Sequence, residues 1–324
     1  MTTAIRSKQT VPDQKAPGSL PHGIVASSVT PFDDDRRVAL DRVHLHIDWL
    51  IEQGVDGISP LGSSGEFAAL ELADRKRVLE AAIQAVSGRT PVLAGTHHYT
   101  TAGTVELSVH AEQAGADALL IVPPYYMVPT RMQVMDHYRA VAAAVSIPVV
   151  LYHNVINVGM ELRAEEILKL HEEGVLAGVK FSHSAAGTIF DLVQGGGDDF
   201  TVYVGVDTVA FEGLCYGAHG WISGIPSIAP RPARRLYEAI AVAGDLEAAR
   251  DEWQRLLPLV RLEFAGIGDG DEPHWFSVMK AALNLLIGSG VGDPVPPLAA
   301  VSPEHLQELT NVLRSLGSLE KQAA

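Results

Sequence analysis

Short apolar runs alternate with longer amphipathic segments from Gly23 onward, and this alternation is typical of repeated βα units around a parallel sheet. Eight apolar runs carry the β-branched residues that favour strands, as many as a closed barrel needs. The pattern therefore predicts an α/β protein with a (β/α)₈ TIM-barrel fold. We expect the strands near Gly23–Thr30, Gly57–Ser59, Pro91–Gly95, Ala118–Val122, Pro148–His153, Leu176–Phe181, Thr201–Val206 and Gly220–Ser223.

Four glycines mark the ends of helical segments just before a predicted strand: Gly54, Gly115, Gly174 and Gly217. Glycine adopts the left-handed conformation without steric cost, so each fits a helix C-cap and a tight turn. A doubly wound sheet would show the same punctuation. However, no G-x-G-x-x-G follows the first strand, so the sequence gives no support for dinucleotide binding.

Helical patterns continue after the eighth strand. Only the first of them is needed to close a barrel, so the others predict a helical C-terminal extension packed on it. We therefore divide the chain into a flexible N-terminal arm (1–20), the barrel (21–245) and the extension (246–324). The extension is expected to contain helices near Leu246–Glu263, Pro273–Ile287 and Pro303–Leu316.

Composition narrows the possible partners. With 24 basic and 39 acidic side chains the formal charge is −15. The sequence contains no block of Lys and Arg residues that could bind along a nucleic acid backbone. No apolar run reaches the roughly 18 residues of a membrane span, and the first 20 residues do not resemble a signal peptide. The single Cys215 excludes an intrachain disulfide and is expected to be buried. We expect a cytoplasmic protein that binds neither nucleic acid nor membrane.

Lys180 is the only lysine within an apolar strand pattern, in the segment Gly178-Val179-Lys180-Phe181-Ser182. A lysine that points into a barrel must pair with a carboxylate, reach solvent or lose its charge, because burial of an ammonium group is unfavourable. A neutral amine is a nucleophile toward carbonyl groups. On this observation alone, a structural lysine and a catalytic lysine both remain open.

Two neighbouring strand ends add chemistry. The preceding strand carries Tyr152 near its end, where the phenol could move a proton beside the lysine. The second strand runs into Gly62-Ser63-Ser64-Gly65-Glu66, a turn of small residues whose backbone N–H groups and hydroxyls could hold a carboxylate. We expect Glu66 to order this turn and not to act as a base.

Together these motifs resemble the dihydrodipicolinate synthase and N-acetylneuraminate lyase family of pyruvate-dependent class I aldolases, over roughly Gly23 to Leu316. The turn resembles the family's carboxylate-binding Gly-Thr/Ser-Thr/Ser-Gly-Glu motif. Pro124-Tyr125-Tyr126 resembles the Pro-Tyr-Tyr after the fourth strand. Tyr152 and Gly178-Val179-Lys180 resemble the catalytic tyrosine and the Schiff-base strand.

The resemblance implies a role for each matching residue. Lys180 would form an imine with a pyruvate-like 2-oxo acid, and Gly62, Ser63 and Ser64 would hold its carboxylate. Tyr152 would shuttle a proton, with Ser63 and with Tyr126 from a neighbouring subunit extending the relay. The backbone carbonyl of Ile222 would lie near the substrate.

The same resemblance implies the partners and cofactors. The substrates would be a 2-oxo acid and an aldehyde, and the protein would be a homo-oligomer, with a tetramer as the usual form. The covalent lysine imine would need no cofactor.

Three positions bear on the second substrate. The synthase branch has an arginine where this chain has Asn157, and an amide cannot supply a charged fork for a second carboxylate. Ser182 after Lys180-Phe181 and Asp207 in Gly205-Val206-Asp207 resemble the lyase and sugar-acid branch. We therefore expect aldol cleavage, condensation or dehydration of a 2-oxo-3-deoxy sugar acid.

Three alternatives stay open. The first is dihydrodipicolinate synthesis from pyruvate and aspartate semialdehyde. The second is a dehydratase, deaminase or hydratase-aldolase on the same scaffold. The third is a barrel that binds a 2-oxo acid without turning it over.

Histidines also follow strands. His97-His98 ends the third predicted strand and His153 the fifth, but no carboxylate stands at metal-ligand spacing beside them. We expect no metal site, and His153 at most contacts the substrate tail.

Overall fold

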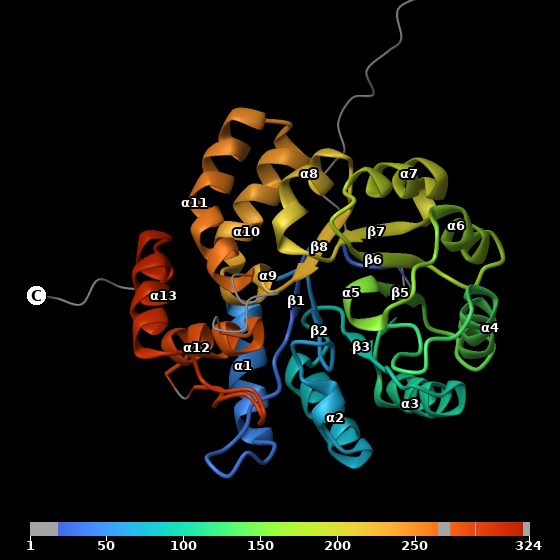
Figure 1. Ribbon diagram of the computed structural model, residues 1–324, viewed down its shortest axis with the longest axis horizontal. Helices are drawn as coiled ribbons and strands as arrows, with labels where there is room; N and C mark the ends of the chain where they lie inside the picture. The colour runs from blue at the N-terminus through green and yellow to red at the C-terminus, as the bar shows by residue number, and fades with distance from the viewer. Residues whose placement is uncertain (1–18, 265–272, 289, 320–324) are drawn as a thin grey trace, which may run out of the picture.

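The computed structural model describes residues 19–264, 273–288 and 290–319. Within them eight parallel strands form one sheet in the order β2-β1-β8-β7-β6-β5-β4-β3, and a parallel bridge between Ile58 and Val92 links the two outer strands. The predicted (β/α)₈ barrel is therefore confirmed (Figure 1). Its strands are β1 (Gly23–Ser27), β2 (Gly57–Ser59), β3 (Leu93–Gly95), β4 (Ala118–Ile121), β5 (Val149–Asn154), β6 (Gly178–Ser182), β7 (Thr201–Val204) and β8 (Gly220–Ser223).

Helices alternate with the strands and cover the outside of the barrel (Figure 1). Every residue of all eight strands is buried, which is the pattern of a parallel sheet that has both faces covered. The helices between the strands are α1 (Leu40–Glu52), α2 (Leu72–Val86), α3 (Thr101–Ala114), α4 (Arg131–Ala142), α5 (Val155–Val158), α6 (Ala164–Glu172), α7 (Gly187–Gly196) and α8 (Ala210–Cys215).

The four punctuating glycines adopt the conformation that the sequence predicts. Gly54, Gly115, Gly174 and Gly217 have φ values of 83°, 100°, 73° and 94°. Each follows a helix and precedes a strand, so the chain reverses within a few residues at the amino-terminal end of the barrel. Short turns at that end leave the longer loops, which can carry a site, at the other end.

After β8 the chain is helical. It runs through α9 (Ile225–Ile228) and α10 (Pro230–Tyr237), and a six-residue π-helical stretch (Glu238–Ala243) extends α10. The remaining helices are α11 (Leu246–Phe264), α12 (Trp275–Leu286) and α13 (Pro303–Ser315).

Figure 1 shows α11, α12 and α13 together on one side of the barrel. They begin and end within a few residues of the bounds that the sequence predicts. The boundary between barrel and extension at residue 245 stays a prediction, and residues 1–18 of the predicted arm lie outside the described residues.

One sequence expectation is wrong. Cys215, at the last position of α8, is exposed and not buried, because that helical position faces away from the barrel. In the described part of the chain, no helix combines the length and the apolar character that crossing a membrane requires.

Candidate active site

Lys180 and Tyr152 lie side by side inside the barrel. They occupy paired positions on the neighbouring strands β6 and β5, so their side chains point to the same face of the sheet. Both are almost completely buried, and the Lys180 Nζ atom lies 3.8 Å from the centre of the Tyr152 ring. Within the described residues no carboxylate lies at ion-pair distance from Lys180, so the structural pairing that the sequence left open is not what is seen.

The Tyr152 hydroxyl faces the turn after β2. Its oxygen lies 3.4 Å from the Ser63 Oγ atom, and either group could donate the hydrogen bond. Burial acts to raise the pKa of Tyr152, but the charge of Lys180 and the hydrogen bond with Ser63 outweigh burial and lower it. A phenol with a lowered pKa gives up its proton more readily, which suits proton transfer.

The small-residue turn is fixed by its own backbone. The Gly65 amide donates to the Gly62 carbonyl and the Glu66 amide donates to the Ser63 carbonyl. The Thr30 hydroxyl donates to the Gly65 carbonyl at 2.7 Å. Glu66 itself adopts a left-handed φ of 52°, an uncommon conformation for a residue with a side chain.

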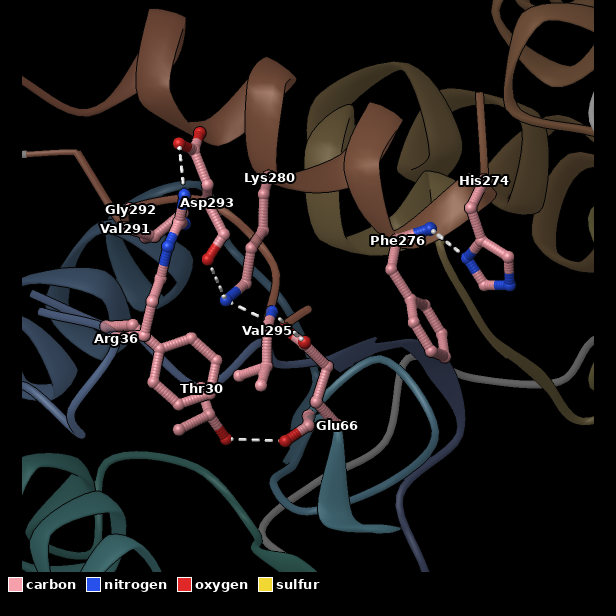
Figure 2. Close-up of polar contacts among 12 residues, drawn as sticks. Thr30, Arg36, Glu66, His274, Phe276, Lys280, Val291, Gly292, Asp293 and Val295 are labelled. Carbon is pink, nitrogen blue, oxygen red and sulfur yellow. Dashed lines mark hydrogen bonds and ion pairs between the residues drawn. The ribbon is translucent and has the colours of Figure 1, made fainter. Parts of the chain in front are cut away.

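Glu66 holds the turn in place through contacts with the C-terminal part of the chain. One of its carboxylate oxygens accepts a hydrogen bond from the Val295 amide at 2.8 Å. The other lies 2.7 Å from the Lys280 Nζ atom of α12, in an ion pair with almost no solvent exposure (Figure 2). This contact confirms the sequence-based expectation that Glu66 has a structural role.

Sequence reasoning overlooked Lys280. It lies in the apolar helical segment Val278-Met279-Lys280-Ala281-Ala282. A lysine among apolar residues was the feature of the sequence that could have indicated its burial. Burial lowers the pKa of the Lys280 amine to about 8, although the charge of Glu66 acts in the opposite direction. Lys280 also lies over the Phe32 ring at 3.9 Å.

A small cavity of about 70 Å³ surrounds the Lys180 amine. Polar side chains in its lining include Tyr152, Ser64, Asn157, Ser182 and Ser223. A small cavity with several polar side chains suits the carboxylate and carbonyl of a small 2-oxo acid.

Two residues in this region are constrained by their neighbours. The Ser182 hydroxyl donates to the Gly205 carbonyl at 2.8 Å, so it helps to hold β6 against the end of β7. A Cβ atom at Gly205 would stand 2.1 Å from Ser182 Oγ and 2.8 Å from Lys180 Cγ. Only glycine allows the chain to pass this close to the lysine.

The Asp207 carboxylate is held by the protein itself. It accepts hydrogen bonds from the Ser223 hydroxyl at 2.5 Å and from the amides of Gly224 and Ile225. Its side chain is fully buried, and burial raises its pKa although these hydrogen bonds and the charge of Lys180 oppose the rise. Its predicted role at a substrate tail stays a prediction.

Glu263, near the end of α11, is a second buried carboxyl that sequence reasoning did not single out. Burial raises its pKa well above the ordinary value, and the negative charge of Asp207 raises the pKa further. A Cβ atom at Gly224 would stand 1.6 Å from its Oε1 atom. Nothing in the local pattern of α11 predicts this approach.

A larger cavity of about 360 Å³ adjoins the lysine cavity. Asn154, Asn157 and Trp275 line both. The larger cavity lies between the carboxyl ends of β2, β4 and β5 on one side and the start of α12 with the segment 295–298 on the other.

Four predicted site residues line neither cavity within one chain: Gly62, Tyr126, Asp207 and Ile222. Tyr126 is 90% exposed and lies on the segment between β4 and α4. Ile222 is fully buried in β8 and lines neither cavity. The implied roles of all four stay predictions.

The histidines serve the barrel framework. His97 Nδ1 accepts a hydrogen bond from the Val122 amide, and burial together with the charges of Arg75 and Lys180 lowers the pKa of His97 well below its usual value. His153 Nε2 lies 3.1 Å from the Leu162 carbonyl oxygen, turned away from the lysine cavity lining. In the described ranges no group of three or more His, Cys, Asp or Glu residues could hold a metal ion.

Comparison with known proteins gives the family. The model of the dihydrodipicolinate synthetase family matches residues 20–316. A 4-hydroxy-tetrahydrodipicolinate synthase of Methanopyrus kandleri is 34% identical over 299 residues, which cover 92% of this chain and 97% of the relative.

Two solved structures add to the comparison. A prophage protein of the dihydrodipicolinic acid synthase family from E. coli K12, described in complex with pyruvate, has 31% identity and a TM-score of 0.84; the match covers 92% of this chain and 99% of that one. A monomeric dihydrodipicolinate synthase variant has 28% identity and a TM-score of 0.85, with 94% and 99% of the two chains covered. The chain therefore belongs to the dihydrodipicolinate synthetase family and is a class I, lysine-imine lyase.

Proposed function

We propose that Lys180 forms an imine with a pyruvate-like 2-oxo acid and that the enzyme makes or breaks the carbon–carbon bond to an aldehyde. The observation that carries this proposal is the pairing of Lys180 with Tyr152 on adjacent strands, with no carboxylate at ion-pair distance from the amine among the described residues. The free amine can attack the 2-oxo carbon, and the resulting iminium acts as an electron sink for the enamine.

The surroundings of Lys180 supply the other functions of the reaction. Ser64 lines the lysine cavity, and the backbone of the Gly62–Glu66 turn is held so that its donors can bind the 2-oxo acid's carboxylate. Tyr152, with its lowered pKa and its contact to Ser63, transfers the proton to or from the aldehyde oxygen.

Enamine formation can be measured without knowing the aldehyde. An enamine exchanges the methyl protons of pyruvate with solvent, so the enzyme in deuterated buffer should remove the pyruvate methyl signal from a proton NMR spectrum. Lys180→Arg should abolish the exchange, because a guanidinium forms no imine under these conditions. Lys169→Arg, at an exposed position of α6, is the matched control. Exchange that survives in Lys180→Arg would contradict the proposal.

The choice of aldehyde is a finer question. The relatives' names favour 4-hydroxy-tetrahydrodipicolinate synthesis over the sugar-acid reaction that the sequence suggested. The contacts of Asp207 with Ser223, Gly224 and Ile225 also weaken the argument for a hydroxylated tail. The reaction of pyruvate with aspartate semialdehyde is therefore the first to assay.

One observation favours a second candidate. Asn157 stands where the synthase branch has its arginine, and no arginine or lysine other than Lys180 lines either cavity in the described structure. An Asn157→Arg variant should gain activity with aspartate semialdehyde if that carboxylate lacks a partner in the natural enzyme. Unchanged or lower activity would favour an aldehyde without a carboxylate recognised at this position and leave the imine chemistry intact.

We also propose a homodimer or higher assembly, formed through the segment between β4 and α4. Tyr126, Met127 and Val128 are exposed there, and Met132 is exposed at the start of α4; a cluster of large apolar side chains commonly marks an interface. Because one related structure is monomeric, family membership alone does not fix the assembly. Tyr126→Ser with Met127→Ser should lower the mass measured by light scattering toward that of one chain; an unchanged mass would exclude this interface.

A further inference from the structure

The 360 Å³ cavity beside the lysine has an apolar and aromatic far side. Ser63, Asn154 and Asn157 lie at the end toward Lys180. The remaining lining is dominated by rings and aliphatic groups, among them Phe67, Tyr125, Val158, Trp275, Phe276 and Pro297. Polarity therefore falls with distance from the amine.

The cavity offers little to a charged or hydroxylated tail. Its one carboxylate, Glu66, is engaged by Lys280 and the Val295 amide. His274 Nδ1 already accepts a hydrogen bond from the Phe276 amide, and burial lowers the pKa of His274 (Figure 2). Removing a carboxylate or several hydroxyls from water into such surroundings is unfavourable without compensating partners.

Arg75, a cation near the cavity, does not provide a partner for a charged substrate tail. Its guanidinium lies 5.3 Å from the centre of the Phe67 ring and donates to the His97 carbonyl at 2.6 Å. It is buried and is not part of the cavity lining. Arg75 is therefore not one of the side chains that a substrate in the cavity would contact.

The size of the cavity suits an apolar ring. A dry cavity of about 150 Å³ lined by apolar side chains is enough to bind benzene. The cavity here is more than twice that volume, and it opens to the lysine cavity through the shared residues Asn154, Asn157 and Trp275. A group bound here would stay attached to the carbon that reacts beside Lys180.

We propose that this cavity is the acceptor site and that the aldehyde partner carries an apolar, preferentially aromatic, group without a carboxylate. This inference rests on the proposed imine chemistry at Lys180. The enamine carbon of pyruvate bonds to the aldehyde carbon while the aldehyde oxygen takes a proton from Tyr152. Water then cleaves the iminium, which frees the lysine amine and a 4-hydroxy-2-oxo acid bearing the apolar group. Cleavage is the reverse of these steps.

Competing aldehydes test the proposal on the full chain. Condensation of pyruvate with benzaldehyde, aspartate semialdehyde and glyceraldehyde is followed by chromatography, with Lys180→Arg as the blank. Burial of a phenyl ring predicts a kcat/KM for benzaldehyde at least about tenfold above that for either polar aldehyde. A preference for aspartate semialdehyde or glyceraldehyde would overturn the proposal.

Variants of lining residues test whether the cavity determines the preference among aldehydes. Ala69 lines it, so Ala69→Phe should reduce the benzaldehyde preference at least about fivefold by filling the space. Phe276→Ala removes a ring from the lining and so enlarges the cavity, which should shift the preference toward naphthaldehyde. This second variant keeps the test valid if Ala69→Phe does not fold. Ala144→Phe, at an exposed position after α4 and at the opposite end of the barrel, is the matched control. Selectivity that neither lining variant alters would overturn the assignment of the cavity.

Separate measurements distinguish failure of the imine chemistry at Lys180 from failure of the acceptor-site assignment. Borohydride reduction in the presence of pyruvate alone reports the imine at Lys180. Trapping of pyruvate together with a polar aldehyde preference rejects only the acceptor site. No trapping rejects the imine chemistry and the acceptor site with it.

Discussion

Lys180 and Lys280 are both buried lysines, but their partners give them different chemistry. Lys280 lies 2.7 Å from Glu66 and also contacts the Asp293 carbonyl, so its charge is compensated within the protein. Lys180 lies against the face of the Tyr152 ring, and no carboxylate of the described residues stands at ion-pair distance from it. A lysine without a fixed partner is the one that can react with a carbonyl group.

Buried histidines make stability depend on pH at the residue scale. Burial and the charge of Lys280 lower the pKa of His46 from 6.5 to about 3. Between these values the unfolded chain binds a proton at His46 that the folded chain does not, so stability falls as pH falls through this window.

Replacing His46 with leucine removes this titration. The free energy of unfolding of the natural protein should therefore drop relative to His46→Leu by about 2 kcal/mol between pH 6.5 and pH 5. Urea denaturation of both proteins at the two pH values measures the difference. A difference that does not change with pH would show that His46 is not held neutral in the fold.

At the scale of elements, the turn after β2 depends on a helix more than 200 residues further along the chain. The Glu66–Lys280 ion pair and the Val295 amide connect the turn to α12 and the segment after it (Figure 2). The C-terminal helices thus help to shape the turn that faces the substrate carboxylate. They also supply Trp275 and Phe276 to the larger cavity.

Removing one partner of the Glu66–Lys280 ion pair should lower the free energy of unfolding. Glu66→Gln or Lys280→Met alone leaves one buried charge without its partner and should reduce stability by about 3–5 kcal/mol. The double variant leaves neither charge and should recover much of that loss. Chemical denaturation of the three variants checks this, and a double variant as unstable as the sum of the single ones would contradict it.

Element positions could be predicted where they depend on local pattern. The strands of the barrel follow from their apolar runs, and the left-handed Gly54, Gly115, Gly174 and Gly217 follow from their places between helix and strand. Lys280 and Glu263 could not be placed in the same way. Their roles come from the docking of α12 and α11 onto the barrel, which the periodicity of each helix does not encode.

At the scale of the whole molecule, the barrel gathers residues from distant parts of the chain at one end. Ser63, Tyr152 and Lys180 could be predicted to meet because each follows or ends a parallel strand, and such ends share one edge. The acceptor cavity could not, since part of its wall comes from α12 and the segment 295–298. The sequence also did not predict that the Asp207 carboxylate accepts hydrogen bonds from Ser223, Gly224 and Ile225.

Of the two buried lysines, Lys180 and not Lys280 is expected to carry the imine. Peptide mapping by mass spectrometry after borohydride reduction with pyruvate tests this directly, because Lys180 and Lys280 fall in different peptides. We expect one reduced pyruvyl group on Lys180 and none on Lys280. A modified Lys280 with an unmodified Lys180, or no modified lysine at all, would contradict the account.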